Sequence, residues 1–194
     1  IFTTDHPTAG KGSVHLGRIP LIIYWPGHIE GGLVQSALLS ETDLASTILE
    51  IAGAKIPDEM QQDGHSFLGL LTSGEYQERS SILMELVNSR AVVKDGFKYI
   101  ANRLPNGTPE EIAALKKVGW LAQPVWHEGY WNLLDSFPNY FDEDELYDIA
   151  ADPLEQHNLA KDPAYREVLV QMRAQLAEPL RTLPHPFGEF TQEK

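Results

Sequence analysis

The sequence has no cysteine, no long hydrophobic run, and only 15 Lys and Arg residues against 28 Asp and Glu residues. Without cysteine, the 194 residues cannot form disulfides, thiolate metal sites or a cysteine nucleophile. The net charge of −13 argues against nucleic-acid binding and against a polybasic membrane anchor, since both need clustered positive charge. The longest apolar stretch, Ile19 to Trp25, is far shorter than the ~20 residues of a membrane-spanning helix.

Several catalytic signatures are missing as well. The sequence has no GxSxG nucleophile elbow and no HExxH zinc pair. The glycine-rich stretch around Lys11 is not a P-loop, because Asp5 stands where the first glycine is required. The chain begins with neither Met nor a leader, and residues 1–4 are typical of the end of a buried strand. We therefore expect that further sequence precedes it.

The first part of the chain predicts alternating strands and helices. The run from Ile19 to Trp25 indicates a strand that is buried on both faces. A helix follows, with Thr42 as its N-cap and Gly53 at its C-terminal stop. Three residues of this helix share the face that we expect to be buried: Leu44, Ile48 and Ile51.

The second part predicts a small antiparallel sheet and a long helix. Strands are expected at residues 82–86, 89–93, 98–102 and 145–149, and a helix at about 108–118. Asp95-Gly96 is the signal for a hairpin turn. The last helix begins at Asp162-Pro163 and should bury one face, made of Tyr165, Leu169, Met172 and Leu176. The whole pattern indicates an α/β region followed by an α+β region.

Four polar residues near the N-terminus are candidates for a functional site. Asp5 and His6 follow a strand and could both bind one divalent cation, or they could be a capping Asp and a surface His. Lys11 lies between two glycines and could bind an anion, or it could be a solvated loop lysine. His15 could donate a proton near neutral pH. Arg18 is expected to brace the loop.

Two further segments stay ambiguous. The acidic run from Asp142 to Glu145 could bind a cation, but it is more typical of a solvated face because the EF-hand spacing is absent. The aromatic segment from Trp120 to Trp131 could line a cleft, cover a core or form a dimer contact.

Several short motifs occur in a characteristic order. They are Thr4-Asp5-His6, Gly10-Lys11-Gly12-Ser13, Arg18-Ile19-Pro20-Leu21-Ile22, Trp25-Pro26-Gly27, Asp43 to Gly53, Asp63-Gly64-His65-Ser66, Arg90-Ala91-Val92, and Glu145-Leu146-Tyr147-Asp148 with Asp152-Pro153-Leu154-Glu155. Together they resemble the C-terminal portion of a formylglycine-dependent sulfatase of the alkaline-phosphatase-like superfamily, and the tail is distantly similar to a heparan N-sulfatase. The resemblance implies that residues 1–75 end the catalytic α/β sheet. It also implies that residues 76–194 form an antiparallel subdomain packed by a long helix.

The resemblance implies roles for individual residues. Asp5 matches a calcium-ligand Asp, His6 matches the adjacent metal ligand, and Lys11 matches the sulfate-binding lysine. His15, in the same loop, is a candidate catalytic residue from its own chemistry, with an ordinary non-catalytic histidine as the alternative. Apart from the resemblance, the clustered aromatic residues suggest the hypothesis that Asn88, Arg90 or the Trp120 to Trp131 segment selects the substrate, because aromatic faces suit sugar rings. The implied activity is hydrolysis of a sulfate ester on a sulfated small molecule or glycan, in a periplasmic or secreted protein. A second copy of the chain is a further candidate partner.

The sequence departs from the sulfatase pattern in one decisive respect. The nucleophile motif, Cys or Ser followed by x-Pro-x-Arg, does not occur, so the formylglycine is expected on a missing N-terminal half. Pro7 also stands where the family usually has glycine. The isolated chain should therefore be inactive, because one site needs all its ligands together. Two alternatives stay open: a phosphodiesterase or phosphonate monoester hydrolase of the same superfamily, and a non-catalytic interaction module.

Overall fold

A computed structural model shows how most of the chain is folded. It describes residues 1–6, 13–55, 57, 59–60, 62–86, 88–103, 110, 137–183, 185 and 187–190. The predicted helix at 108–118 and the segment from Trp120 to Trp131 lie outside the described residues, apart from Glu110. Within the described part, no helix is long and apolar enough to cross a membrane.

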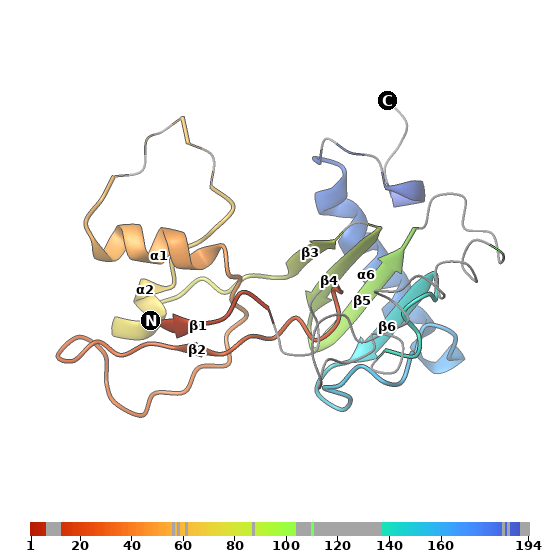
Figure 1. The fold of residues 1–194 in the computed structure, drawn as a ribbon, viewed down its shortest axis with the longest axis horizontal. Helices are drawn as coiled ribbons and strands as arrows, with labels where there is room; N and C mark the ends of the chain where they lie inside the picture. The colour runs from red at the N-terminus through yellow and green to blue at the C-terminus, as the bar shows by residue number, and fades with distance from the viewer. Residues whose placement is uncertain are drawn as a thin grey trace. The chain divides into compact units, whose positions relative to one another are not determined.

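The chain divides into two compact units (Figure 1). The first unit comprises residues 1–2 and 21–82, and the second comprises residues 3–20 and 83–194. The elements are β1 (Phe2–Thr3), β2 (Leu21–Ile22), α1 (Asp43–Ile51), α2 (Leu68–Thr72), β3 (Ile82–Leu86), β4 (Ser89–Lys94), β5 (Phe97–Asn102), β6 (Asp144–Asp148), the 3₁₀ turn η1 (Pro163–Tyr165), α6 (Arg166–Leu180) and the 3₁₀ turn η2 (Gly188–Phe190). The predicted division after residue 75 stays a prediction.

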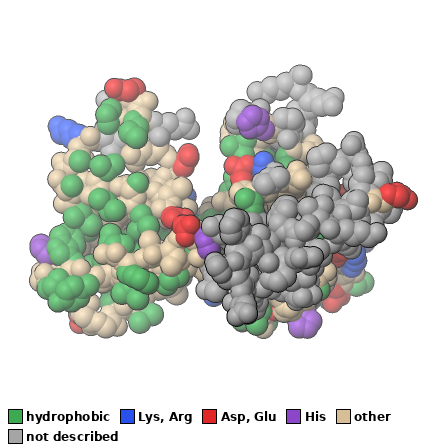
Figure 2. Space-filling model, viewed as in Figure 1, with side chains coloured by type: hydrophobic (Ala, Val, Ile, Leu, Met, Phe, Trp, Pro, Cys, Tyr) green, Lys and Arg blue, Asp and Glu red, His purple; other side chains and the backbone are tan. Residues whose placement is uncertain are grey.

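The predicted buried strand at Ile19 to Trp25 is wrong in length and in burial. Only Leu21 and Ile22 form a strand, and they pair with β1 in a 2-stranded sheet. Ile22 is 61% exposed and Tyr24 is 83% exposed, and Figure 2 shows hydrophobic side chains spread over the surface of this unit. An apolar run shows that a segment favours burial, but a strand is buried on both faces only where other elements pack against each face of its sheet. Among the described residues, β1 is the one strand paired with β2.

Helix α1 occurs where the sequence predicts it, but its buried face is a different one. The predicted apolar face is partly open, since Ile48 is 49% exposed, whereas the buried residues are Asp43, Ser46 and Thr47. Thr42 occupies the predicted N-cap position, but its side chain makes no capping hydrogen bond to the helix. Gly53 ends the helix with a φ of +64°, as expected.

Hydrogen bonds to the segment at residues 62–67 explain why the polar face of α1 is buried. The Asp43 carboxylate accepts a bond of 2.7 Å from the His65 amide, and Thr47 Oγ1 accepts one of 3.0 Å from the Phe67 amide. Arg79 pairs with Asp43 through two guanidinium nitrogens. Burial alone would raise the pKa of Asp43, but these hydrogen bonds outweigh it and hold that pKa below its usual value.

The second unit is built on the 4-stranded sheet β3-β4-β5-β6, which confirms the predicted antiparallel subdomain. Strands β4 and β5 form the predicted hairpin, with Lys94 opposite Phe97 across the turn. Asp95 and Gly96 have φ values of +50° and +80°. Two successive positive φ angles are typical of the type I′ turn that Asp-Gly sequences favour.

The two faces of this sheet are covered by different segments. One face packs on α6, whose buried residues Met172 and Leu176 lie against Tyr99 and Leu146. This confirms the predicted apolar face of the last helix. The other face carries Lys98, Ile100 and Asn102 of β5, because side chains alternate along a strand. Residues 13–16 lie against this second face.

Candidate functional site

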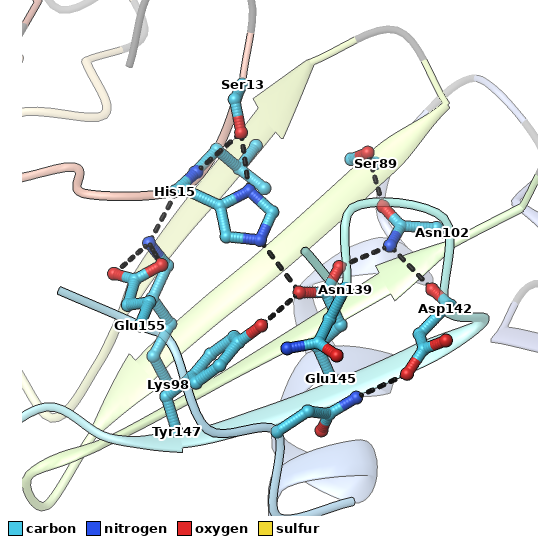
Figure 3. Close-up of polar contacts among 12 residues, drawn as sticks. Ser13, His15, Ser89, Lys98, Asn102, Asn139, Asp142, Glu145, Tyr147 and Glu155 are labelled. Carbon is cyan, nitrogen blue, oxygen red and sulfur yellow. Dashed lines mark hydrogen bonds and ion pairs between the residues drawn. The ribbon is translucent and has the colours of Figure 1, made fainter. Parts of the chain in front are cut away.

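His15 is buried on the second face of the sheet and hydrogen-bonded at both ring nitrogens (Figure 3). Its Nε2 atom lies 2.7 Å from Glu145 Oε2, and its Nδ1 atom lies 2.5 Å from Ser13 Oγ. Ser13 Oγ also accepts a 3.0 Å bond from the His15 amide. The ring stacks on Phe137 at a centroid distance of 4.4 Å. A neutral imidazole with its proton on Nε2 satisfies all of these hydrogen bonds.

Glu145 joins His15 to the strands. Its carboxylate is buried and accepts a 2.7 Å bond from Asn102 Nδ2, in addition to bonds from His15 and the Tyr147 hydroxyl. Burial raises the pKa of Tyr147, and the nearby carboxylate raises it further. The prediction that the acidic run is a solvated face is therefore wrong for Glu145, which is fully buried. A carboxylate with three donors is satisfied in such a position.

A second buried pair, Lys98 and Glu155, lies on the same face of the sheet. The Lys98 ammonium donates to Glu155 Oε1 at 2.8 Å and to Oε2 at 3.1 Å. It also donates to the Val14 carbonyl at 2.5 Å, and Glu155 Oε1 accepts from the Leu16 amide at 3.1 Å. Burial lowers the pKa of Lys98, and the adjacent carboxylate opposes this shift. Both residues of the pair therefore bond directly to the backbone of residues 14–16.

Two residues in this cluster have a strained backbone. Leu16 has a φ of +49° and Glu155 a φ of +56°, which is the left-handed region that residues with a Cβ seldom adopt. The two residues are bonded to each other through the Leu16 amide. Such strain costs on the order of 1–3 kcal/mol per residue and persists only where the surroundings enforce it.

The order Ser13, His15, Glu145 resembles a charge-relay triad in composition, but its geometry does not suit catalysis. The His15 side chain is only 2% exposed, so a substrate cannot reach its ring. Ser13 Oγ is engaged with both the ring and the amide of His15. The arrangement is that of a structural clamp and leaves no nitrogen free for proton transfer to a ligand.

Asp5 and His6 lie side by side at the start of the same unit. His6 Nε2 is 3.6 Å from Asp5 Oδ1, and the Asp5 carboxylate is 81% exposed. In the described part of the chain, no group of three or more His, Cys, Asp or Glu residues is placed to hold a metal ion. Asp5 supplies oxygen, which suits calcium, but calcium takes 6–8 oxygen ligands and His6 offers nitrogen. The pair alone therefore does not make a calcium site, and its predicted role as metal ligands stays a prediction.

Comparison with known proteins identifies the relatives of this chain. Residues 14–97 match the family model described as N-sulphoglucosamine sulphohydrolase, C-terminal. An ulvan-active sulfatase of Formosa agariphila is 30% identical over 185 residues, which cover 87% of this chain and 34% of that protein. An N-acetylgalactosamine-6-O-sulfatase of Bacteroides thetaiotaomicron is 28% identical over 170 residues, covering 85% of this chain and 27% of that protein.

The chain corresponds to the C-terminal portion of a sulfatase. It spans between about a quarter and a third of the length of these two curated relatives. A solved structure from work on glycosaminoglycan metabolism by Bacteroides thetaiotaomicron agrees, with a TM-score of 0.56 and 26% identity over 86% of this chain and 29% of that one. The predicted resemblance and the mixed α/β fold are thus confirmed.

The structure brings together only some of the residues predicted for the sulfatase site. Lys11 lies outside the described residues. Arg90 is on β4, where its guanidinium pairs with Glu85 at 2.6 Å and lies over the Phe187 ring at 4.8 Å. Phe187 belongs to the core on the α6 face, whereas His15 contacts the opposite face. The predicted roles of Lys11 and Arg90 stay predictions.

Sequence reasoning missed three residues of the cluster: Lys98, Glu145 and Glu155. All three are charged and buried, in strands or turns where polar residues usually face solvent. Their partners in residues 13–16 lie 84, 130 and 139 positions away along the chain. Lys98 and Glu155 are themselves 57 positions apart. The alternation Phe97-Lys98-Tyr99 would by itself place Lys98 on a solvent-facing side of the strand, so no local pattern in the sequence indicates its burial.

Proposed function

We propose that the protein to which this chain belongs is a sulfuric ester hydrolase that acts on a sulfated carbohydrate. The observation that supports this is similarity along most of the chain to two carbohydrate sulfatases, at 30% and 28% identity. The Bacteroides structure with 26% identity supports the same fold over 86% of the chain. We place the protein in the periplasm or outside the cell, as its sulfatase relationship suggests.

Within this protein, residues near the start of this chain would supply one side of the active site. Asp5 and His6 would bind a divalent cation, for which calcium is our proposal, and the exposed Asp5 carboxylate is available for this. Lys11 would bind the sulfate group. A bound cation would stabilise negative charge on the sulfate oxygens. The formylglycine nucleophile and the remaining ligands would come from the N-terminal part of the protein.

The test is sulfate release by the complete gene product, expressed with the enzyme that forms formylglycine. Ion chromatography would measure free sulfate from ulvan oligosaccharides, N-acetylgalactosamine 6-sulfate and glucosamine N-sulfate. We expect release from at least one of them, and a loss of at least ~100-fold in Asp5→Ala. Glu143→Ala, which removes an exposed acidic side chain of the same unit, is the control and should keep full activity.

Other outcomes would overturn the proposal. Hydrolysis of bis(4-nitrophenyl) phosphate or a phosphonate monoester, without sulfate release from any saccharide, would favour the other hydrolase of the superfamily. No turnover of either class, by a product that carries no aldehyde by mass spectrometry, would favour an interaction module. The isolated 194-residue chain should release no sulfate under the same conditions.

A further inference from the structure

Residues 13–16 are hydrogen-bonded to buried charged side chains on the sheet, although burying apolar side chains would cost less free energy of desolvation. Lys98 and Glu155 bond to the backbone of Val14 and Leu16, and Glu145 bonds to the ring of His15. The side chains of all three charged residues are at most 4% exposed. Removing such charges from water costs several kcal/mol per ion, and hydrophobic replacements are often neutral or stabilising. Stability alone therefore does not account for this cluster.

The buried cluster of Lys98, Glu155, His15 and Glu145 fixes the backbone conformation of residues 14–16, which apolar packing alone would leave undefined. Lys98 Nζ donates to the Val14 carbonyl and Glu155 Oε1 accepts from the Leu16 amide, so the two members of one ion pair hold backbone groups two residues apart. Leu16 is held in a left-handed conformation, and so is Glu155 itself. Backbone strain of this kind concentrates at functional sites, where it sets the position of neighbouring groups.

Residues 13–16 are close in the chain to the predicted site residues. Residues 7–12 are all that separate His6 from Ser13, and residues 3–20 belong to the same compact unit as the sheet. We propose that Lys98 and Glu155, together with His15 and Glu145, are positioning residues of the sulfatase site. They hold residues 13–16 on the sheet and thereby fix where Asp5 and His6 lie. This inference rests on the proposed function.

The experiment compares two Met variants of the complete, formylglycine-bearing protein. Lys98→Met removes the cation that links Glu155 to Val14. Arg173→Met is the matched control, because Arg173 also pairs with acidic residues, Asp144 and Glu189, but from α6 on the opposite face of the sheet. Lys98→Arg keeps the positive charge. Each variant is assayed for kcat and KM of sulfate release and for hydrogen exchange of peptides that cover residues 1–6 and 13–16.

We expect kcat of Lys98→Met to fall by about 10- to 100-fold after correction for the folded fraction, because small displacements of catalytic groups have effects of this size. KM should change less than kcat. Lys98→Arg should recover most of the loss, and Arg173→Met should stay within about twofold of wild type. Both peptides should exchange faster in Lys98→Met than in Arg173→Met.

The inference is overturned if the two Met variants lose activity equally, or if both peptides exchange at the same rate in both variants. The exchange result does not depend on activity. If the wild-type protein releases no sulfate, the proposed function fails. Faster exchange of residues 1–6 in Lys98→Met would then still show that the cluster positions them, and unchanged exchange would refute it.

Discussion

Replacing Lys98 and Glu155 singly and together tests whether their pairing, and not their separate packing, supports the second unit. In Lys98→Met, the Glu155 carboxylate loses its cation and keeps the Leu16 amide, while the Val14 carbonyl loses its donor. In Glu155→Gln, the ammonium stays buried without a countercharge. Removing one partner of a buried ion pair costs on the order of 3–5 kcal/mol. We expect each single substitution to lower the free energy of unfolding of the second unit by that amount.

The double variant should cost much less than the sum. With Lys98→Met and Glu155→Gln together, no charge is left uncompensated, and the Gln oxygen still accepts from the Leu16 amide. We expect a coupling energy of at least ~2 kcal/mol, since pairs in one network typically couple by about 0.5–3 kcal/mol.

Native-state hydrogen exchange of the β4 and β5 amides measures these free energies, because these strands lie at the centre of the sheet. Arg173→Met and Asp144→Asn, alone and combined, give the corresponding cycle on the α6 face. If the free energies for Lys98 and Glu155 add within ~0.5 kcal/mol, the two side chains act independently and the reasoning is refuted.

Further predictions concern single positions. Leu16→Gly should be more stable than Leu16→Ala by ~1 kcal/mol in chemical unfolding, the reverse of the usual order, because both lose the same packing but only Gly relaxes a φ of +49°. Gly96→Ala should cost ~1 kcal/mol by the same measurement, whereas Gly31→Ala, which has open space and no positive φ, should be neutral. The pKa of Asp43 is lowered on folding, so its stabilisation is present above pH 3.8 and is lost as pH falls through its folded pKa. Asp43→Asn should remove that acid dependence from thermal unfolding curves. Hydrogen bonds from Arg103 lower the pKa of Glu189 from 4.5 to about 2, so Glu189→Gln should flatten the decline of stability between these pH values, modestly because the carboxylate is half exposed. An unchanged pH profile would contradict either assignment.

Local signals in the sequence predict the second unit well. The hairpin follows from Asp95-Gly96, because few residues other than Asp, Asn and Gly adopt two successive positive φ angles. The face of α6 follows from its apolar spacing, and β3 occupies 82–86 as predicted. These features depend on neighbours within one turn of helix or one hairpin, so a single sequence contains the information that determines them.

The first unit shows where such signals fail. Apolar spacing in α1 predicts that Leu44, Ile48 and Ile51 are buried, but Asp43, Ser46 and Thr47 are buried instead. Besides local bonds to Ser40 and within the helix, each of the three has a partner 16 or more positions along the chain, as Ser46 has in Gln62. A polar helix face becomes buried when a distant segment supplies hydrogen-bond donors and acceptors that match it. A local sequence pattern does not predict which segment that is.

For the same reason, the sequence predicts Asp5, His6 and Lys11 as site residues but does not predict the buried cluster around His15. Asp5, His6 and Lys11 could be named because short motifs that resemble a family contain them, whereas Glu145 and Glu155 belong to motifs without an evident chemical role. His15 connects the two sets. The sequence predicts it as a proton donor. In the structure it is buried and both ring nitrogens are hydrogen-bonded, one of them to Glu145, which lies 130 positions further along the chain. A histidine held in this way fixes the backbone that carries it. Its effect on catalysis would then appear in kcat through the placement of Asp5 and His6, without proton transfer by its own ring.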